Sequence, residues 1–169
     1  NKEEYFKMLD WGLNQTEHPV AIRVPVVDVV TTGEEDSTDY SILNKSKVIK
    51  KGKDVAIIAL SNFYNLGKEI ADDLGNVTLI NPVYITGLDE ELLEKLKKDH
   101  KLVITLEDGV LDGGFGEKVS RFYGTSDIKV KNYGIKKSFP DRFVAKKFLI
   151  ENGISKKQIV KDIKELLEK

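Results

Sequence analysis

Long apolar runs alternate with amphipathic stretches along residues 47–169. The segments DVAIIAL (54–60) and KLVITL (101–106) are almost continuously apolar. Such runs are typical of strands that are covered on both faces, so helices are expected on both sides of their sheet. We predict that these two segments are the central strands of one sheet and that they run in the same direction.

The stretches beside these strands have helical periodicity. One helical face collects Phe63, Leu66, Ile70 and Leu74, and Gly75 stands where a left-handed C-cap belongs. Further on, Thr86 and Asp89 have the spacing of a capping box, in which a hydroxyl and a carboxylate satisfy free N–H groups. The buried stripe after that box would consist of four leucines, at 88, 92, 93 and 96.

Shorter apolar runs complete an alternation of strands and helices. Strands are expected at 47–52, where the strand would lie at an edge, at 77–85 and at 128–135. A further helix would run through Phe115, Val119 and Phe122. This order predicts βαβ crossovers and an α/β fold with a largely parallel sheet.

The C-terminal tail carries signals for two more helices. Asp141, in the turn SFPDRF (138–143), can cap a following helix. Ser155 and Gln158 form a second capping box, and Ile154 and Ile159 have the spacing of a hydrophobic staple. We expect the last helix to bury Ile159, Ile163, Leu166 and Leu167.

The N-terminal part differs from the rest in its pattern. Apolar positions from Tyr5 to Leu13 recur at helical spacing, and HPVAIRVPVV (18–27) has the pattern of a short buried strand. Residues 28–46 are polar and rich in turn formers, which is typical of a linker or a long surface loop. The expected domains are therefore 1–27, the linker 28–46, and 47–169.

The stretch TLEDGVLDGGFG (105–116) is the one glycine-rich candidate for a phosphate site. It matches neither G-x-G-x-x-G nor the Walker pattern. Asp112 would repel a phosphate, whereas as a helix N-cap it would stabilise the helix by about 1 kcal/mol. We therefore expect Gly113, Gly114 and Gly116 to form a structural turn in which a helix start approaches a strand end.

Several side chains remain as candidates for chemistry. Glu107 and its neighbour Asp108 point to opposite sides of an extended chain, so we favour a structural or interface role for Glu107 over catalysis. Arg23 in an apolar strand needs a partner, and two readings stay open for it: a salt bridge at the strand end, or a bidentate grip on phosphate. His18 and His100 are expected in exposed loops.

Composition and charge exclude several classes of site and partner. With 27 Lys and Arg against 28 Asp and Glu, the net charge of -1 provides no basic field for nucleic acid or an anionic membrane. The chain has two histidines and no cysteine, which argues against zinc and is compatible with a reducing cytoplasm. No G-x-S-x-G hydrolase motif is present. The apolar runs are too short to span a bilayer, and because Asn1-Lys2-Glu3-Glu4 is not a signal peptide and lacks Met, we expect a piece of a longer chain.

Taken together, five stretches resemble the C-terminal part of 1-deoxy-D-xylulose-5-phosphate synthase, within the transketolase superfamily. They read, in order, PVAIRVP, KKGKDVAIIAL, LINPVYITGLDEELLEKL, LVITLEDGVLDGGFG and FPDRF. The segment TLEDG…GGFG is shared with transketolases and 2-oxo acid dehydrogenase beta subunits, whereas PDRF is closer to the synthase branch. The similarity extends over nearly the whole chain.

This resemblance implies a three-layer αβα domain with a mixed, mostly parallel five-stranded sheet whose first strand runs antiparallel. Residues 1–27 would be the last helix and strand of a preceding pyrimidine-binding domain. The synthase condenses pyruvate with glyceraldehyde 3-phosphate and releases CO2, with thiamine diphosphate and Mg2+ held by its earlier domains. By this resemblance the present chain serves structure and dimerisation, binds no cofactor by itself and is silent alone, and its partners are a second copy and the remaining domains.

Departures from the family pattern leave an alternative open. Arg23 matches the Arg of the family's R-Y-P-R-G segment, which contacts substrate phosphate, but here the segment reads Arg-Val-Pro-Val-Val. Ser61 replaces a glycine after the first long strand, and Gly87 replaces a proline. The alternatives are a non-catalytic binding or assembly module, or a fragment of a transketolase or a 2-oxo acid dehydrogenase beta subunit.

Overall fold

A computed structural model describes residues 1–24 and 29–168. The chain forms two compact units, Asn1–Leu43 and Asn44–Lys169. The boundary therefore falls between residues 43 and 44, whereas the sequence predicted a linker over 28–46. Each unit is described by itself below.

The second unit contains a five-stranded sheet in the order β1-β3-β2-β4-β5. Its central strands β2 and β4 run parallel, with Ile57 opposite Ile104, as the sequence predicted. Strands β3 and β5 add in parallel, and the edge strand β1 pairs antiparallel with β3. The strands are β1 (Lys47–Lys50), β2 (Asp54–Ala59), β3 (Thr78–Asn81), β4 (His100–Val110) and β5 (Lys129–Ile135).

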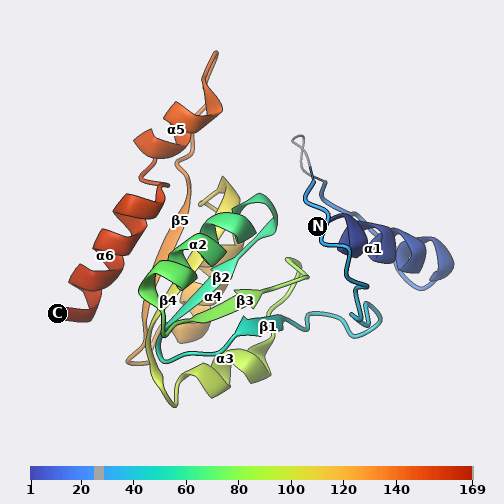
Figure 1. Cartoon of the computed structure of the whole chain (residues 1–169), viewed down its shortest axis with the longest axis horizontal. Coiled ribbons are helices and arrows are strands. Elements are labelled where there is room, and N and C mark those ends of the chain that lie inside the picture. Colours follow the sequence, from blue (N-terminus) through green and yellow to red (C-terminus); the bar gives the residue numbers. More distant parts are fainter. Residues whose placement is uncertain (25–28, 169) are drawn as a thin grey trace. The chain divides into compact units, whose positions relative to one another are not determined.

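Helices cover both faces of this sheet, which confirms the three-layer αβα architecture (Figure 1). One face packs against α2 (Tyr64–Leu74) and α6 (Lys156–Glu168), and the other against α3 (Glu90–Leu96) and α4 (Phe115–Tyr123). Alternate residues of β2 supply the two cores. Val55, Ile57 and Ala59 belong to the first core cluster, and Ala56, Ile58 and Leu60 belong to the second.

One of the predicted helix ends is confirmed, and two of the predicted helix caps are not. Gly75 ends α2 with a φ of 80°, in the left-handed region where a glycine was expected. The capping box at Thr86 is not formed: Asp89 itself is the N-cap of α3 and accepts from Leu92 N. Asp141 caps no helix, because the short helix α5 (Ala145–Glu151) starts later, after Val144.

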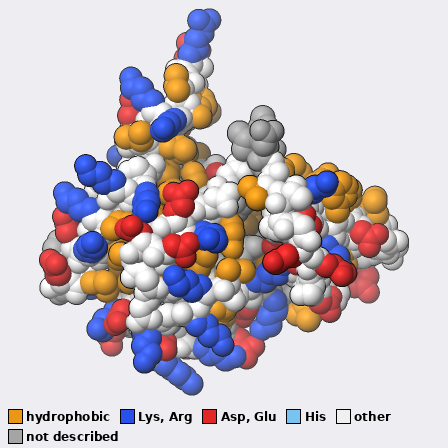
Figure 2. Space-filling view, viewed as in Figure 1, with side chains coloured by type: hydrophobic (Ala, Val, Ile, Leu, Met, Phe, Trp, Pro, Cys, Tyr) orange, Lys and Arg blue, Asp and Glu red, His pale blue; other side chains and the backbone are white. Residues whose placement is uncertain are grey.

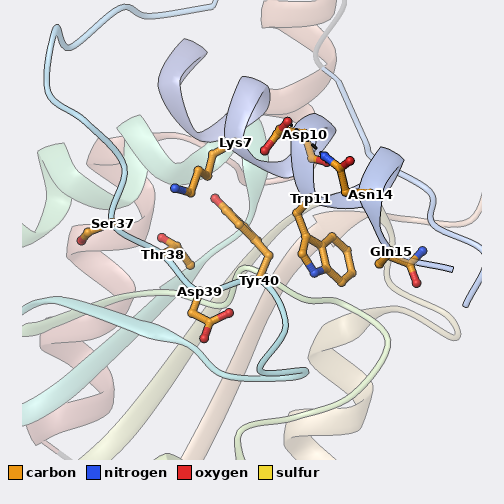
Figure 3. A pocket seen from close by; sticks show the side chains of 9 residues that line it. All are labelled: Lys7, Asp10, Trp11, Asn14, Gln15, Ser37, Thr38, Asp39 and Tyr40. Atoms are coloured by element: carbon orange, nitrogen blue, oxygen red, sulfur yellow. Dashed lines mark hydrogen bonds between the residues drawn. The ribbon is translucent and has the colours of Figure 1, made fainter. Parts of the chain in front are cut away.

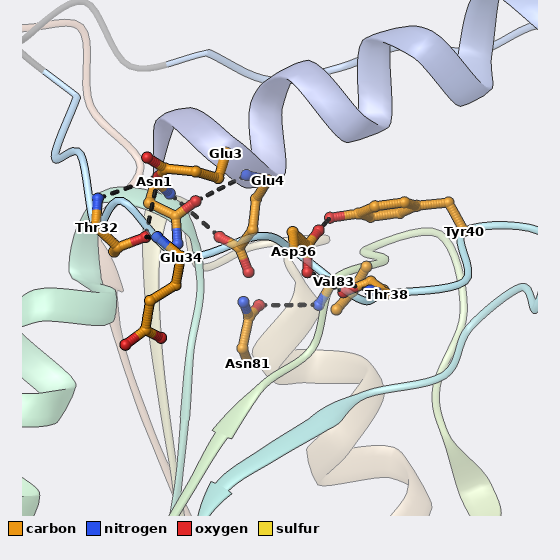
Figure 4. Close-up of polar contacts among 10 residues, drawn as sticks. All are labelled: Asn1, Glu3, Glu4, Thr32, Glu34, Asp36, Thr38, Tyr40, Asn81 and Val83. Atoms are coloured by element: carbon orange, nitrogen blue, oxygen red, sulfur yellow. Dashed lines mark hydrogen bonds and ion pairs between the residues drawn. The ribbon is translucent and has the colours of Figure 1, made fainter.

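The predicted strand 77–85 is cut short at Asn81. A tight turn follows, in which Val83 N donates to Asn81 Oδ1 at 3.1 Å (Figure 4) and Tyr84 N donates to Pro82 O at 2.6 Å. Val83 has a φ of 61°, which is unusual for a β-branched residue. The chain leaves the sheet at this turn and then enters α3.

The first unit contains the helix α1 (Lys2–Asn14), which Asn1 and Glu4 start with a capping box. Residues 18–24 form no strand, so the predicted strand is wrong over this part, and residues 25–27 lie outside the described residues. Glu3 holds the segment that was expected to be a linker or a long surface loop. Its carboxylate accepts from Thr32 N and Oγ1 at 3.1 Å (Figure 4). It also accepts from Gly33 N at 3.0 Å. These bonds, chiefly that from Thr32 N, lower the pKa of Glu3 to about 2.

Candidate functional site

A buried carboxylate lies between β4 and the start of α4 in the second unit. The Glu107 side chain, 4% exposed, reaches the start of the helix. Its Oε2 accepts from Phe115 N at 2.8 Å and its Oε1 accepts from Gly116 N at 3.1 Å. The first N–H groups of a helix lack partners within the helix, so this carboxylate acts as a remote N-cap.

The glycines of the turn make room for this carboxylate and for the neighbouring strands. A Cβ on Gly114 would lie 2.5 Å from Glu107 Oε2, and one on Gly116 would lie 2.7 Å from Thr105 Oγ1. Gly113 has open space around it but a φ of 74°, which disfavours other residues. The turn therefore brings the backbone of α4 close to Thr105 of β4 and, through Gly116, to Asn132 of β5.

The electrostatics of this turn disfavour a phosphate. Burial raises the pKa of Glu107 above its ordinary value, although the bonds from Gly116 N and Phe115 N counteract that effect. Nearby, Gly113 N donates to Glu117 Oε2 at 2.9 Å. Carboxylates thus accept from Gly113, Phe115 and Gly116 N, and Gly114 N donates to Leu111 O, so an incoming anion would find these donors occupied and would meet negative charge.

Sequence reasoning missed the capping role of Glu107. It assigned the cap to Asp112, but Asp112 is exposed and the N-cap position is held by Gly114, which has no side chain to donate or accept. Local capping rules look within a few residues of the helix start, whereas Glu107 lies eight residues before Phe115. The available signal was a carboxylate at the end of a buried strand.

His100 corrects another prediction, because it is buried rather than exposed. Its Nδ1 lies 2.8 Å from Asp99 Oδ1 and 3.2 Å from Leu96 O, and its Nε2 lies 2.8 Å from Thr78 Oγ1. Both neighbours of Nδ1 are acceptors, so Nδ1 carries a proton. Thr78 Oγ1 also bonds to Gly52, so this buried chain joins β3 and β4 to the loop before β2.

The other predicted site residues lie in the first unit. Arg23 is exposed and belongs to a segment without helix or strand. His18 is exposed, as expected, with Nε2 3.9 Å from Glu17 Oε2.

The first unit also has an open hollow of about 550 Å³ between α1 and the segment 37–40 (Figure 3). Its aromatic part is formed by Trp11 and Tyr40, whose ring centroids are 6.5 Å apart. Tyr40 is buried, and its hydroxyl donates to Asp36 Oδ2 at 2.6 Å. The other lining residues are polar or charged: Lys7, Asp10, Asn14, Gln15, Ser37, Thr38 and Asp39.

The described part of the chain contains neither a cluster of metal ligands nor a membrane-spanning helix. Within residues 1–24 and 29–168, no three His, Asp or Glu side chains converge as metal ligands would. In the same ranges no helix is both long and apolar enough to cross a bilayer.

A family model for "Transketolase, C-terminal domain" matches residues 44–159. The 1-deoxy-D-xylulose-5-phosphate synthase of Lachnoclostridium phytofermentans is 36% identical over 149 residues, which cover 85% of this chain and 23% of that protein. The synthase of Carboxydothermus hydrogenoformans is 31% identical over 177 residues, which cover all of this chain and 28% of that protein. The chain thus spans about a quarter of the length of these curated relatives.

Among solved structures, a "split gene transketolase, inactive beta4 tetramer" has a TM-score of 0.69 and 22% identity. The match covers 85% of this chain and 47% of that one. At this identity the likeness concerns the fold alone, and it agrees with the mixed sheet and the two helical layers described above.

Proposed function

Because the chain belongs to the family of transketolase C-terminal domains, we propose that it is the C-terminal part of a thiamine-diphosphate-dependent transferase of the 1-deoxy-D-xylulose-5-phosphate synthase type. The observation that carries this proposal is the 36% identity to such a synthase over 85% of the chain. The parent would join pyruvate and glyceraldehyde 3-phosphate into 1-deoxy-D-xylulose 5-phosphate and release CO2. In a cell this activity would reside in the cytoplasm.

Within that parent, the present chain would supply structure and a dimer interface rather than reacting groups. By the family resemblance we assign thiamine diphosphate and Mg2+ to other parts of the parent. The closed turn at Glu107 supports the same division, since its backbone donors are already taken. Because Glu107 is buried and bonded to the start of α4, we assign it the structural one of its two expected roles.

Arg23 is the one residue of this chain that we propose to touch substrate. Its exposed guanidinium, in a segment without regular structure, could grip the phosphate of glyceraldehyde 3-phosphate in a bidentate manner. Such a contact lies far from the reacting carbon and binds the ground state and the transition state alike. Its loss should therefore weaken substrate binding rather than slow the chemical step.

The test uses the longer parent, purified with thiamine diphosphate and Mg2+. We expect CO2 release from pyruvate that depends on glyceraldehyde 3-phosphate, and we expect Arg23→Ala to raise KM for the phosphorylated substrate about tenfold with kcat little changed. The matched control is Arg121→Ala, another exposed arginine, which should leave both constants unchanged. A parent that neither decarboxylates pyruvate nor transfers a ketol group would refute the proposal.

A second candidate is a non-catalytic assembly module that keeps this fold. The observation in its favour is the segment at 23–27, which reads Arg-Val-Pro-Val-Val and retains a single arginine. The parent assay separates the two candidates, since a module would be inactive even with cofactor and both substrates. For the isolated chain, titration calorimetry with thiamine diphosphate and Mg2+ should show no heat of binding, and micromolar affinity would contradict our placement of the cofactor.

A further inference from the structure

The hollow beside α1 combines aromatic and acidic side chains, and the proposed transferase reaction makes no use of it (Figure 3). All of its described lining residues belong to the unit Asn1–Leu43. Ligand pockets usually have volumes of about 300–1,000 Å³ and combine aromatic walls with a few polar groups. At about 550 Å³ this hollow is large enough for a small ligand.

Two aromatic rings form the apolar wall of the hollow. Trp11 and Tyr40 have ring centroids 6.5 Å apart, with an angle of 38° between their planes. Tyr40 is 4% exposed, and its hydroxyl donates to Asp36 Oδ2 at 2.6 Å, which fixes the orientation of the ring. Trp11 is half-buried and reaches the hollow from α1 (Figure 3). The faces of such rings attract cations, and that of tryptophan does so most strongly.

The charged side chains around the rings also favour a cation. Asp10 on α1 and Asp39 on the facing segment both line the hollow, and Lys7 is the one cation among the lining residues that the structure describes. Asp39 Oδ1 accepts from Ser41 Oγ at 2.6 Å and from Ser41 N at 2.9 Å. These bonds, chiefly that from the hydroxyl, lower the pKa of Asp39, so it is ionised at neutral pH. The lining therefore has two carboxylates and one ammonium group.

The first unit as a whole is acidic. Residues 1–43 contain nine Asp or Glu and three Lys or Arg. Acidic side chains are prominent on the face of this unit that Figure 2 shows. An excess of one sign of charge around a hollow raises the local concentration of oppositely charged ligands. Cationic ligands are therefore favoured over anionic ones.

We propose that this hollow binds an aliphatic diamine or polyamine. One ammonium group pairs with Asp10 and a second pairs with Asp39, on the two walls of the hollow. Asn14 Nδ2 donates to Asp10 Oδ1 at 3.2 Å, which orients that carboxylate. The methylene groups between the two ammonium groups lie against Trp11 and Tyr40, which offer apolar contact as well as attraction for a cation. A ligand with a single ammonium group reaches only one of the two carboxylates.

The fluorescence of Trp11 tests this site directly, because the chain has a single tryptophan. The 169-residue chain is titrated with putrescine at constant ionic strength, without thiamine diphosphate. We expect a saturable change in emission with a Kd on the order of 1 mM. Butylamine carries one ammonium group and should bind about threefold more weakly, and the neutral analogue butanediol should give no saturable change. The titration needs no transferase activity, so its outcome is independent of the proposed function.

Carboxylate variants test the two ion pairs. Asp10→Asn and, separately, Asp39→Asn keep the size of the side chain but remove its charge. Each should weaken putrescine binding about threefold or more. The matched control is Glu34→Gln, which removes an exposed carboxylate of the same unit outside the hollow and should leave the Kd unchanged.

Lys7 distinguishes a cationic ligand from an anionic or zwitterionic one. Besides the bonds from Ser41, the charge of Lys7 lowers the pKa of Asp39, so Lys7 competes with the ligand for this carboxylate. Lys7→Met keeps an apolar side chain but removes the charge, and it should tighten putrescine binding about threefold. The control is Lys2→Met, at the start of α1 and outside the hollow, which should have no effect.

Three outcomes would overturn the proposal. Putrescine could leave the emission of Trp11 unchanged, or change it equally in the original chain and in both carboxylate variants, which would indicate a nonspecific effect of salt. Butanediol could alter the emission as strongly as putrescine, which would assign the hollow to uncharged ligands. Weaker binding after Lys7→Met would mean that Lys7 contacts an acidic group of the ligand.

Discussion

At the residue scale, Glu107 decides whether the start of α4 is stable. Replacing Glu107 by Ala leaves the N–H groups of Phe115 and Gly116 buried without an acceptor. We expect the free energy of unfolding at pH 7 to fall by about 2 kcal/mol, as measured by urea denaturation. The control is Glu117→Ala, which removes an exposed carboxylate from Gly113 N and should cost about 0.5 kcal/mol or less.

The loss in free energy of unfolding caused by Glu107→Ala should also depend on pH. Burial raises the folded-state pKa of Glu107 above 4.5, so protonation is favoured in the folded protein. A group of this kind contributes stability below pH 4.5 and loses it as the pH rises through the folded-state value. The loss caused by Glu107→Ala should therefore be larger at pH 4.5 than at pH 7. An equal or smaller loss at pH 4.5 would contradict the raised pKa.

Residue-scale reasoning from the sequence failed where a partner lies far along the chain or in space. The two expected caps, Asp112 and Asp141, bind no helix start, while Glu107 does so across eight residues. His100 follows a charged helix end and was expected in solvent, but it is buried against Thr78, 22 residues away. Hydrogen-bond partners of this kind depend on strand register, which a single sequence does not encode locally.

At the scale of elements, apolar periodicity was sufficient for most of the second unit. The sequence predicted the shared direction of β2 and β4 and the helices on both faces, because burial on two faces leaves a continuous apolar run. It also predicted the left-handed end of α2, from Gly75. The ends of elements were less predictable. Strand β3 stops at Asn81, where the turn around Val83 interrupts an apolar run that continues in sequence.

Close packing between elements gives a second prediction, at the contact of α4 with β4 and β5. A Cβ on Gly116 would lie 2.7 Å from both Thr105 Oγ1 and Asn132 Cγ, whose side chains bond to each other at 2.8 Å. Gly116→Ala should therefore lower the free energy of unfolding by about 2–3 kcal/mol. Gly109→Ala is the control, because its Cβ would have nothing within 4 Å, and a similar loss there would argue against a steric cause.

At the scale of the whole molecule, the two units differ in how well the sequence described them. The αβα unit was predicted in outline, since its cores lie within one regular alternation of strands and helices. In the first unit the helix predicted around Tyr5–Leu13 is present as α1, and residues 29–46, expected to be a linker or a long surface loop, contain no helix or strand. The sequence did not predict that Glu3 holds Thr32 and Gly33 through three hydrogen bonds. Polar side chains make these contacts, and the spacing of apolar residues does not reveal such contacts.

This difference leads to a prediction about independent folding. Every member of both core clusters lies within residues 44–169, so removal of residues 1–43 takes nothing from either core. The chain 44–169 should unfold cooperatively in calorimetry, with a Tm within about 3 °C of the second unit's transition in the whole chain. The matched control is the chain 44–151, which loses Ile154, Ile159 and Ile163 from the first core and should not unfold cooperatively. If the chain 44–169 also lacks a cooperative transition, the core of this domain depends on residues before 44. The second unit then does not fold independently of the first.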